Sequence, residues 1–153
     1  MTDRDDATPG GEPHLSYVVA RLERAVRREI NDRVRPHGLT TSQYTTLSIL
    51  GLGRPLSNAQ LARRAYMTPQ AMSETIEALE GLALITRRAS PEHRRVLPAT
   101  LTAKGRKVLA ACETAVSEME EEMLRGLGQA QRRALLDGLL TAVRALHAGF
   151  PAE

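Results

Sequence analysis

The 153-residue sequence contains a single cysteine, Cys112, so neither an intrachain disulfide framework nor a cysteine-based zinc site can form. Tryptophan is absent and aromatic residues make up only 3% of the chain, which argues against binding of RNA or single-stranded nucleic acid on stacked aromatic side chains. No apolar run approaches the roughly 20 residues needed to cross a bilayer, and the chain does not open with a charged-then-apolar signal. These absences predict a cytoplasmic protein that does not bind membranes.

Residue patterns typical of catalytic and metal sites are also missing. The four histidines are scattered without ligand spacing, and the sequence has neither a phosphate-binding glycine loop nor a cluster of nucleophile, base and orienting group. We therefore expect no enzymatic activity, no cofactor and no metal. The glutamates between Glu118 and Glu122 fit a solvated helix face better than a metal site. Cys112 falls on an apolar stripe, which favours a small buried hydrophobe over a redox-active thiol without excluding the latter.

Charge is distributed unevenly along the chain. Residues 54–107 contain ten basic and four acidic residues, whereas residues 1–13 and 108–153 each carry a net charge of −3 within a total of +3. Because lysine and arginine release phosphate counterions on binding, the basic middle segment indicates a nucleic-acid partner. The acidic first 13 residues, with two prolines and two glycines, predict a disordered tail.

Two helices are expected before the basic segment. Apolar residues from Leu15 to Val34 recur at spacings of three and four, which predicts a helix that ends before the Pro-His-Gly sequence that follows. Thr40 and Gln43 have the spacing of a capping box and predict the start of a second helix. The glycines and proline of residues 51–55 should end it.

Residues 57–82 have the pattern of two short capped helices joined by a tight turn. Ser57 and Gln60 form a second capping-box pair, and Thr68-Pro69 combines an N-cap hydroxyl with proline at the first helical position. In the second of these helices the apolar residues fall on one stripe, which is expected to be buried: Met72, Ile76, Leu79 and Leu82. The polar residues are expected outside this stripe: Gln70, Ser73, Glu74 and Glu77. Two capped helices with a turn of about three residues predict a helix-turn-helix.

After Leu84 the apolar period changes from helical to extended. Residues 84–88 and 95–101 are short runs with strand character, separated by a polar, proline-containing turn at residues 89–94. We therefore expect a β-hairpin, or wing, with a basic tip. Pro98 has no N–H to donate to a ladder, which predicts that the returning strand is an edge strand.

The last part of the chain predicts two further helices. Thr102 is expected to cap a long helix that continues to about Leu127, which at about 1.5 Å per residue would measure about 35 to 40 Å. The final helix carries more aliphatic side chains than one thin helix layer can bury: Leu135, Leu136, Leu139, Leu140, Val143 and Leu146. We expect this helix and the first one to form a homodimer interface, the alternative being an intrachain helix hairpin that buries part of the stripe.

Together these segments resemble the MarR family of bacterial transcription regulators. The matching residues are Gly38-Leu39-Thr40, Gln43-Tyr44 and Leu47 before the motif, Leu61-Ala62, Thr68-Pro69, Leu79-Glu80 and Leu84-Ile85-Thr86-Arg87 within it, and Arg94-Arg95 and Leu101-Thr102-Ala103-Lys104-Gly105 after it. The resemblance implies a mainly α fold. Residues 37–102 would form a winged helix-turn-helix, with a three-helix core and a small β-hairpin wing, and residues 14–36 and 103–150 a helical dimerisation region.

The chain departs from the family pattern at three places. The wing usually carries aspartates where Ser90 and His93 stand, and a glycine usually precedes Leu84 where this chain has Ala83. The recognition-helix position of Glu74 is often basic. The first departure bears on salt bridges inside the wing, and the last bears on the DNA sequence preference.

The second motif helix and the wing contain the expected DNA contacts. Side chains at the exposed start of such a helix can reach base edges, and wing arginines can enter a minor groove of negative potential. The candidate DNA-binding residues are Thr68, Pro69, Gln70, Ala71, Ser73, Glu74, Arg87, Arg88, Arg94 and Arg95. The alternatives are a solvated helix face and, at the tip, a surface salt-bridge cluster of Arg94 and Arg95 with Glu92. Arg63 and Arg64 are weaker candidates for phosphate contact.

The resemblance also implies that a small aromatic or phenolic effector can occupy a cleft between the dimer helices and the DNA-binding part. Tyr17 and Tyr44 are candidates to line it, with Arg21 as a carboxylate partner. We therefore expect a sequence-specific transcription regulator, acting as a repressor, that binds a palindromic double-stranded operator as a homodimer and is relieved by the effector. The alternative is a winged-helix adaptor for protein interactions that has lost DNA binding, which would be expected to lose the wing arginines that this chain retains.

Overall fold

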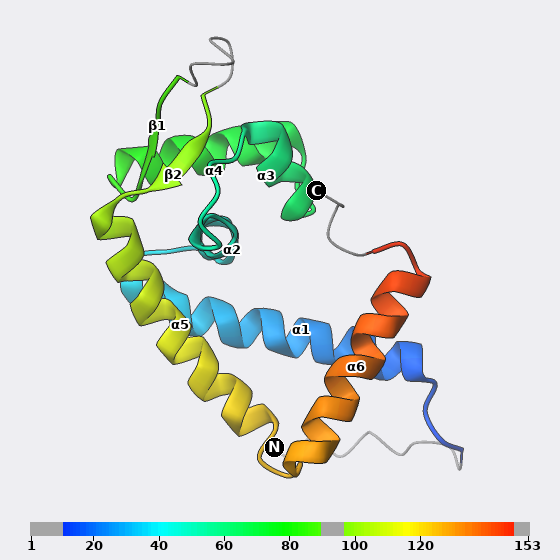
Figure 1. The fold of residues 1–153 in the computed structure, drawn as a ribbon. Helices are drawn as coiled ribbons and strands as arrows, with labels where there is room; N and C mark the ends of the chain where they lie inside the picture. The colour runs from blue at the N-terminus through cyan, green and yellow to red at the C-terminus, as the bar shows by residue number, and fades with distance from the viewer. Residues whose placement is uncertain (1–10, 90–96, 149–153) are drawn as a thin grey trace, which may run out of the picture.

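The computed structural model describes residues 11–89 and 97–148, and these ranges form the mainly helical winged fold that the sequence predicts. The elements are α1 (Leu15–Val34), the short 3-10 helix η1 (Arg35–His37), α2 (Thr41–Gly51), α3 (Asn58–Arg64), α4 (Pro69–Gly81), β1 (Ile85–Arg87), β2 (Ala99–Leu101), α5 (Ala103–Met123) and α6 (Gln129–Ala145). Figure 1 shows α3, α4 and the two strands at one end of the molecule and α1 and α6 at the other, with α5 running from the strands to the second end. The predicted wing tip, including Arg94 and Arg95, and most of the predicted tail lie outside the described residues.

The predicted helix starts are confirmed by individual hydrogen bonds. The Thr40 hydroxyl accepts from the backbone N–H of Gln43 at 3.2 Å, and the Gln43 side chain accepts from the backbone N–H of Thr40 at 2.9 Å. Ser57 and Gln60 form the same reciprocal pair at the start of α3. The Thr68 hydroxyl accepts from a backbone N–H in the first turn of α4 at 3.1 Å. Each of these residues satisfies N–H groups that a helix start leaves without a partner, so local sequence determines where the helices begin.

One hydrophobic core joins the end of α1, the helix-turn-helix, the strands and α5 as far as Met119. Leu47 of α2 and Leu61 of α3 are completely buried, and Ile76 of α4 is 1% exposed. The same core contains Met72, Leu79, Leu84, Ile85, Leu109 and Cys112. Leu82, expected on the buried stripe of α4, is instead 42% exposed because it is the C-cap, where the chain leaves the helix. Residues 37–102, here called the winged unit, therefore bury most of their apolar stripe within one chain.

The sheet is shorter than predicted. Both strands are only three residues long, with Ile85 opposite Leu101 and Arg87 opposite Ala99. In the part of the chain that the structure describes, β2 lies at the edge of this two-stranded sheet, as predicted. Ala99 also exchanges two backbone hydrogen bonds with Leu56, at 2.8 and 3.2 Å, so this edge is covered at one residue. The absence of an N–H from proline disrupts no ladder because Pro98 lies just before β2.

Gly105 allows the first turn of α5 to lie directly against the chain that precedes β1. A Cβ atom built on Gly105 would lie 1.9 Å from the carbonyl oxygen of Leu84. No side chain can occupy that space without moving the backbone, so the close approach requires glycine. At the same junction the Thr102 hydroxyl accepts from the N–H of Gly105 at 2.9 Å and caps the helix, as predicted.

Helix α5 is shorter than the sequence predicts. It ends at Met123, which makes it about 31 Å long at about 1.5 Å per residue, and the expected end at Leu127 is wrong. The physical reason lies in α6. The Arg132 guanidinium donates to the carbonyl oxygens of Leu124 and Leu127, at 3.1 Å each, and so stabilises a turn where the helix would otherwise continue.

Helix α6 leaves its apolar stripe exposed. None of its residues is buried, and the exposed fraction is 57% at Leu136 and 37% at Leu140. The N-terminal half of α1 is similar, since Leu15 is 74% exposed and Val18 is 43% exposed. The intrachain hairpin considered for these residues therefore covers little of the stripe. No helix in the described ranges is long and apolar enough to cross a membrane.

Candidate nucleic-acid interface

The angle between α3 and α4 is held by Asn58. Its side-chain Nδ2 donates to the carbonyl oxygen of Pro69 and to the hydroxyl oxygen of Ser73, each at 3.2 Å. Its Oδ1 is buried and has no hydrogen-bond partner among the described residues. Burial of an unsatisfied acceptor costs free energy, which the two donated hydrogen bonds offset. Because these bonds connect α3 to α4, Asn58 is a positioning residue for the helix-turn-helix. No sequence pattern distinguishes Asn58, because its two partners lie 11 and 15 residues further along the chain.

The exposed face of α4 contains Thr68, Pro69, Gln70 and Glu74. Ala71 is half-buried. The Gln70 Nε2 donates to Glu74 Oε1 at 3.1 Å, so these two side chains form a pair on the surface.

Ser73 was expected on the outer face of α4, and it is instead half-buried at the α3–α4 contact. The reason is that α3 packs on that side of α4 and Asn58 donates to the Ser73 hydroxyl. The hydroxyl proton of Ser73 can still be donated, but the side chain faces the neighbouring helix more than solvent.

Arg87 of β1 is held by Glu80 from the last turn of α4. The two side chains form an ion pair with an N–O distance of 2.5 Å, and this hydrogen bond raises the pKa of the Arg87 guanidinium above its usual value. Arg88 is exposed beside it, with its backbone N–H directed to the carbonyl oxygen of Pro98. The pairing with Glu80 was missed because it joins two different elements, although Glu80 lies only seven residues before Arg87 in the sequence. Arg94 and Arg95, the remaining wing candidates, lie outside the described residues.

The candidate effector residues do not all meet. Tyr17 and Arg21 line one pocket on α1 together with Arg24 and Arg28. The Arg21 guanidinium donates to the Tyr17 hydroxyl at 3.0 Å and lies 5.7 Å from the ring centroid. Tyr44 does not line this pocket. It is half-buried against the core, and burial is the main cause that raises the pKa of its hydroxyl.

A second pocket lies between α1, α2 and the turn that joins α3 to α4. Its volume is about 350 Å³, and its lining includes Arg27 of α1, Thr41 of α2, and Tyr66 and Met67 of the turn. Tyr66 has a left-handed backbone, with φ of +53°, and its hydroxyl donates to the carbonyl oxygen of Ala148. This pocket therefore contacts both the first helix and the helix-turn-helix.

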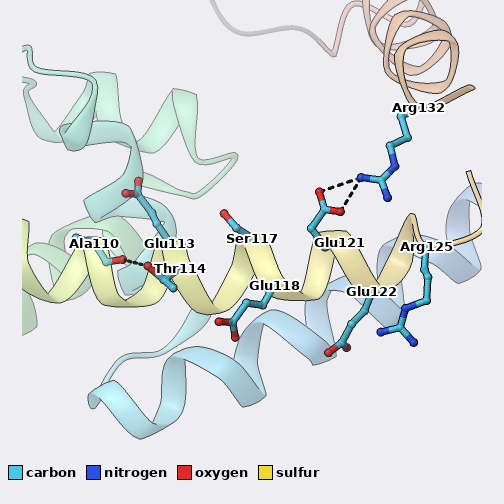
Figure 2. A pocket seen from close by; sticks show the side chains of 9 residues that line it. All are labelled: Ala110, Glu113, Thr114, Ser117, Glu118, Glu121, Glu122, Arg125 and Arg132. Atoms are coloured by element: carbon cyan, nitrogen blue, oxygen red, sulfur yellow. Dashed lines mark hydrogen bonds and ion pairs between the residues drawn. The ribbon is translucent and has the colours of Figure 1, made fainter. Parts of the chain in front are cut away.

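Figure 2 shows an acidic groove along α5, from Ala110 and Glu113 to Arg132 in the first turn of α6. Glu121 accepts from Arg132 at 2.7 Å, and Glu122 accepts from Arg33 at 2.9 Å, so two of its carboxylates are paired with arginines. Within residues 11–89 and 97–148 no group of three or more histidine, cysteine or acidic side chains is arranged to hold a metal ion. The basic segment of residues 54–107 and the acidic residues of α5 therefore lie in different parts of the chain.

Cys112 is completely buried on the inner side of α5. Burial is the main cause that raises the pKa of its thiol, and the neighbouring Glu113 acts in the same direction. A raised pKa leaves little reactive thiolate near neutral pH. This environment is that of a structural cysteine.

Comparison with known proteins agrees with this arrangement. The family model described as MarR family matches residues 37–96. The HTH-type transcriptional repressor Rv2887 of Mycobacterium tuberculosis (strain ATCC 25618 / H37Rv) is 37% identical over 119 residues, which cover 78% of this chain and 86% of the repressor. This chain belongs to the MarR family.

Solved MarR-type structures have the same fold. The transcriptional repressor CouR, bound to a 23-mer DNA duplex, superposes with a TM-score of 0.77 at 30% identity, covering 85% of this chain and 92% of CouR. The Mycobacterium tuberculosis MarR family protein Rv2887 in complex with DNA gives a TM-score of 0.72 at 31% identity, covering 86% and 98% of the two chains. Its complex with p-aminosalicylic acid gives 0.71 at 34% identity, covering 85% and 98%.

One departure from the MarR pattern has a visible structural effect. Ala83 occupies the position before Leu84 where the sequence pattern usually has glycine, and its φ is +58°. An L-residue with a Cβ is strained in this left-handed region, whereas glycine is not. This MarR-family chain therefore accepts local strain at the junction between α4 and β1.

Proposed function

We propose that this MarR-family protein represses transcription by binding duplex DNA as a homodimer. The observation that carries the proposal is the geometry of the winged unit. Its recognition helix α4 is fixed by Asn58 on one side and presents Gln70 and Glu74 to solvent on the other. The relatives named as repressors and the DNA-bound neighbours support this assignment, and the proposal includes no catalytic activity.

In the proposed complex the first turns of α4 enter the major groove and the wing lies along the backbone. Thr68, Pro69 and Gln70 lie at the exposed helix start, where backbone N–H groups and side chains can meet phosphates and base edges. Arg87 and Arg88 contact phosphates, while Arg94 and Arg95 retain the minor-groove role proposed from the sequence. Glu80 acts here by orienting Arg87.

The dimer interface is proposed to be the exposed apolar surface of α6 and the N-terminal half of α1. Contiguous apolar surface of this kind marks an interaction site in most proteins. A second copy of the chain can cover it by two-fold symmetry, which also matches a palindromic operator. The residues concerned are Leu15, Val18, Val19 and Leu22 of α1 and Leu135, Leu136, Leu140 and Val143 of α6.

We further propose that a small aromatic carboxylate relieves repression. Neighbours of known structure are complexes with salicylic acid and with p-aminosalicylic acid, both at 34% identity to this chain. The pocket at the α3–α4 turn is the preferred site because a ligand there touches α1 and the helix-turn-helix together. Such a ligand would bind one relative placement of these elements better than another and so shift the population. The Tyr17–Arg21 pocket on α1 is the second candidate.

A fluorescence titration of labelled duplex DNA at several salt concentrations tests the main proposal. Binding through phosphate contacts should weaken by at least about 100-fold between 50 and 200 mM salt. If no duplex binds even at low salt, the protein is an adaptor and the proposal is wrong. Affinity that does not change with salt would contradict the phosphate contacts.

Calorimetric titration with salicylate separates the two effector sites. Arg27→Ala removes a possible carboxylate partner from the pocket at the turn, and Arg21→Ala removes one from the pocket on α1. A charge-assisted hydrogen bond is worth about 1.5 to 3 kcal/mol, so the relevant variant should bind salicylate about 10- to 100-fold more weakly. If neither variant changes the affinity, both sites are excluded as carboxylate sites.

A further inference from the structure

Gln70 and Glu74 form one hydrogen-bonded unit on the exposed face of the recognition helix. The Gln70 Nε2 donates to Glu74 Oε1 at 3.1 Å, and both side chains are exposed. Within the described residues Gln70 is the only hydrogen-bond partner of Glu74, which forms no ion pair. The pair thus combines an amide whose orientation is favoured by one hydrogen bond with a carboxylate that still has free acceptor positions.

The hydrogen bond determines what Gln70 can offer to a base. A glutamine amide has two N–H donors and one carbonyl acceptor, and one donor is already used by Glu74. The remaining N–H and the carbonyl oxygen form an adjacent donor and acceptor. That arrangement is complementary to the N7 acceptor and N6 amino group of adenine in the major groove. Glu74 therefore orients Gln70 for adenine.

The carboxylate of Glu74 is selective in a different way. It can only accept hydrogen bonds, so it is attracted to an exocyclic amino group and repelled by the oxygen and nitrogen acceptors of guanine and thymine. Its charge also opposes the approach of phosphates, which lowers affinity for DNA that offers no compensating donor. A cytosine amino group is such a donor.

We propose that Gln70 and Glu74 together set the base preference of this protein, with Gln70 reading adenine and Glu74 requiring cytosine nearby. Residues four apart on a helix face lie about 5 to 6 Å apart, which corresponds to one or two base-pair steps. The predicted half-site therefore contains an adenine and a cytosine within two base pairs of each other. The inference rests on the proposed DNA binding and names what that site recognises.

The support of α4 makes such a preference sharp. Asn58 joins the first turns of α4 to α3 through Pro69 and Ser73, on the side of the helix opposite to solvent. The Thr68 cap fixes where the helix begins. Gln70 and Glu74 consequently project from a rigid element, and only their own side-chain torsions remain to be ordered on binding.

Selection of bound sequences from a randomised duplex library tests the proposal, with the wild type, Glu74→Gln and Gln70→Ala compared at one salt concentration. The wild type should prefer cytosine over guanine or thymine at one half-site position by about 5- to 100-fold. In Glu74→Gln this preference should fall below about 3-fold, because an amide can donate as well as accept. Gln70→Ala should lose the adenine preference at the neighbouring position.

Glu77→Gln is the matched control. It removes the same charge from another exposed position of α4, and Glu77 has no hydrogen bond to Gln70. Both charge-removing variants should bind unrelated duplex DNA more tightly than the wild type. Only Glu74→Gln should also change the selected sequence.

The outcomes separate this inference from the function on which it rests. A wild type that selects a sequence, together with Glu74→Gln that selects the same one, overturns the inference and leaves DNA binding intact. A selected half-site without an adenine and a cytosine within two base pairs also overturns it. A wild type that retains no duplex overturns the proposed function and this inference together.

Discussion

Most leucines of the winged unit are buried, whereas most of those in α6 and in the N-terminal part of α1 are exposed. In the winged unit Leu47 and Leu61 are completely buried by other parts of the chain. In the arm, defined as α6 with residues 15–22 of α1, Leu136 is 57% exposed and Leu15 is 74% exposed. A leucine stripe therefore predicts burial in both regions, but only the structure shows whether the same chain provides the cover.

This contrast explains how the protein is organised. The winged unit needs a defined shape before it meets DNA, and its core and capped helices provide that shape within one chain. The arm leaves apolar side chains exposed on its helices, and exposed apolar surface of this kind usually marks a site of protein association. In the proposed function DNA binding and dimerisation thus belong to different regions, so variants can test them separately.

The largest effect is expected in the arm. Leu136→Glu combined with Leu140→Glu places charges in the proposed interface of both subunits, and should weaken dimerisation by at least about 4 kcal/mol, or roughly 1000-fold. Light scattering at micromolar concentration should then report a monomer, and far-UV circular dichroism should show unchanged helix content. Leu52→Glu is the control, because Leu52 is 77% exposed at the end of α2 and lies outside the arm. A double variant that stays dimeric would show that the arm does not form the dimer interface.

The second prediction concerns the winged unit. Gly105→Ala places a Cβ against the backbone carbonyl of Leu84 and should destabilise the fold by about 3 kcal/mol, measured by urea denaturation. Gly81→Ala is the matched control, since nothing lies within 4 Å of a Cβ at Gly81, and its effect should be at most about 1 kcal/mol and stabilising. Equal stability of the two variants would show that the close approach at Gly105 is not required.

The third prediction sharpens the assignment of the wing. Arg87→Ala should weaken DNA binding by about 1 to 2 kcal/mol and reduce the salt dependence by about one charge per subunit. Glu80→Gln keeps the arginine but loosens its orientation, and it also removes a negative charge that opposes phosphates, so the affinity should change by less than about threefold. The dimer should be unaffected by either change. Full affinity in Arg87→Ala would move the phosphate contact elsewhere.

The smallest effect is expected at the junction between α4 and β1. Ala83→Gly relieves a left-handed backbone at φ of +58° and should stabilise the protein by about 0.5 to 1 kcal/mol. Ala78→Gly, on the exposed face of α4, should instead destabilise it by about 1 kcal/mol. Thermal or urea unfolding of the pair would detect the opposite signs, and a destabilised Ala83→Gly would contradict the strain.

Local sequence was sufficient for the helix starts and for the helix-turn-helix. Thr40, Ser57 and Thr68 each act on N–H groups within three residues of themselves, so their roles follow from spacing alone. The strand-like runs after Leu84 predict the wing and the apolar period predicts the long helices, and the family resemblance adds how these elements are grouped into a winged unit and a dimerisation region. These parts of the fold are determined by interactions that are short in sequence.

Contacts between elements could not be predicted in the same way. Asn58 binds two residues of α4 that are 11 and 15 positions away, and this contact makes Ser73 half-buried where the helical period places it outside. Leu56 pairs with Ala99 across 43 positions and so covers the expected edge of β2. Periodicity identifies the face of an element, but it does not identify what packs there.

The corner between α5 and α6 has a mechanical consequence. Arg132 donates to two backbone carbonyls in the turn through Nε and Nη2. Its Nη1 donates to both carboxylate oxygens of Glu121 (Figure 2), so each of the three guanidinium nitrogens has an acceptor on the α5 side. Because all of these bonds come from one planar group, they hold the angle between α5 and α6 and oppose bending at the turn. In the proposed dimer α5 and α6 would then move together as one rigid unit. The spacing of the two recognition helices would change where α1 and α5 meet the winged unit.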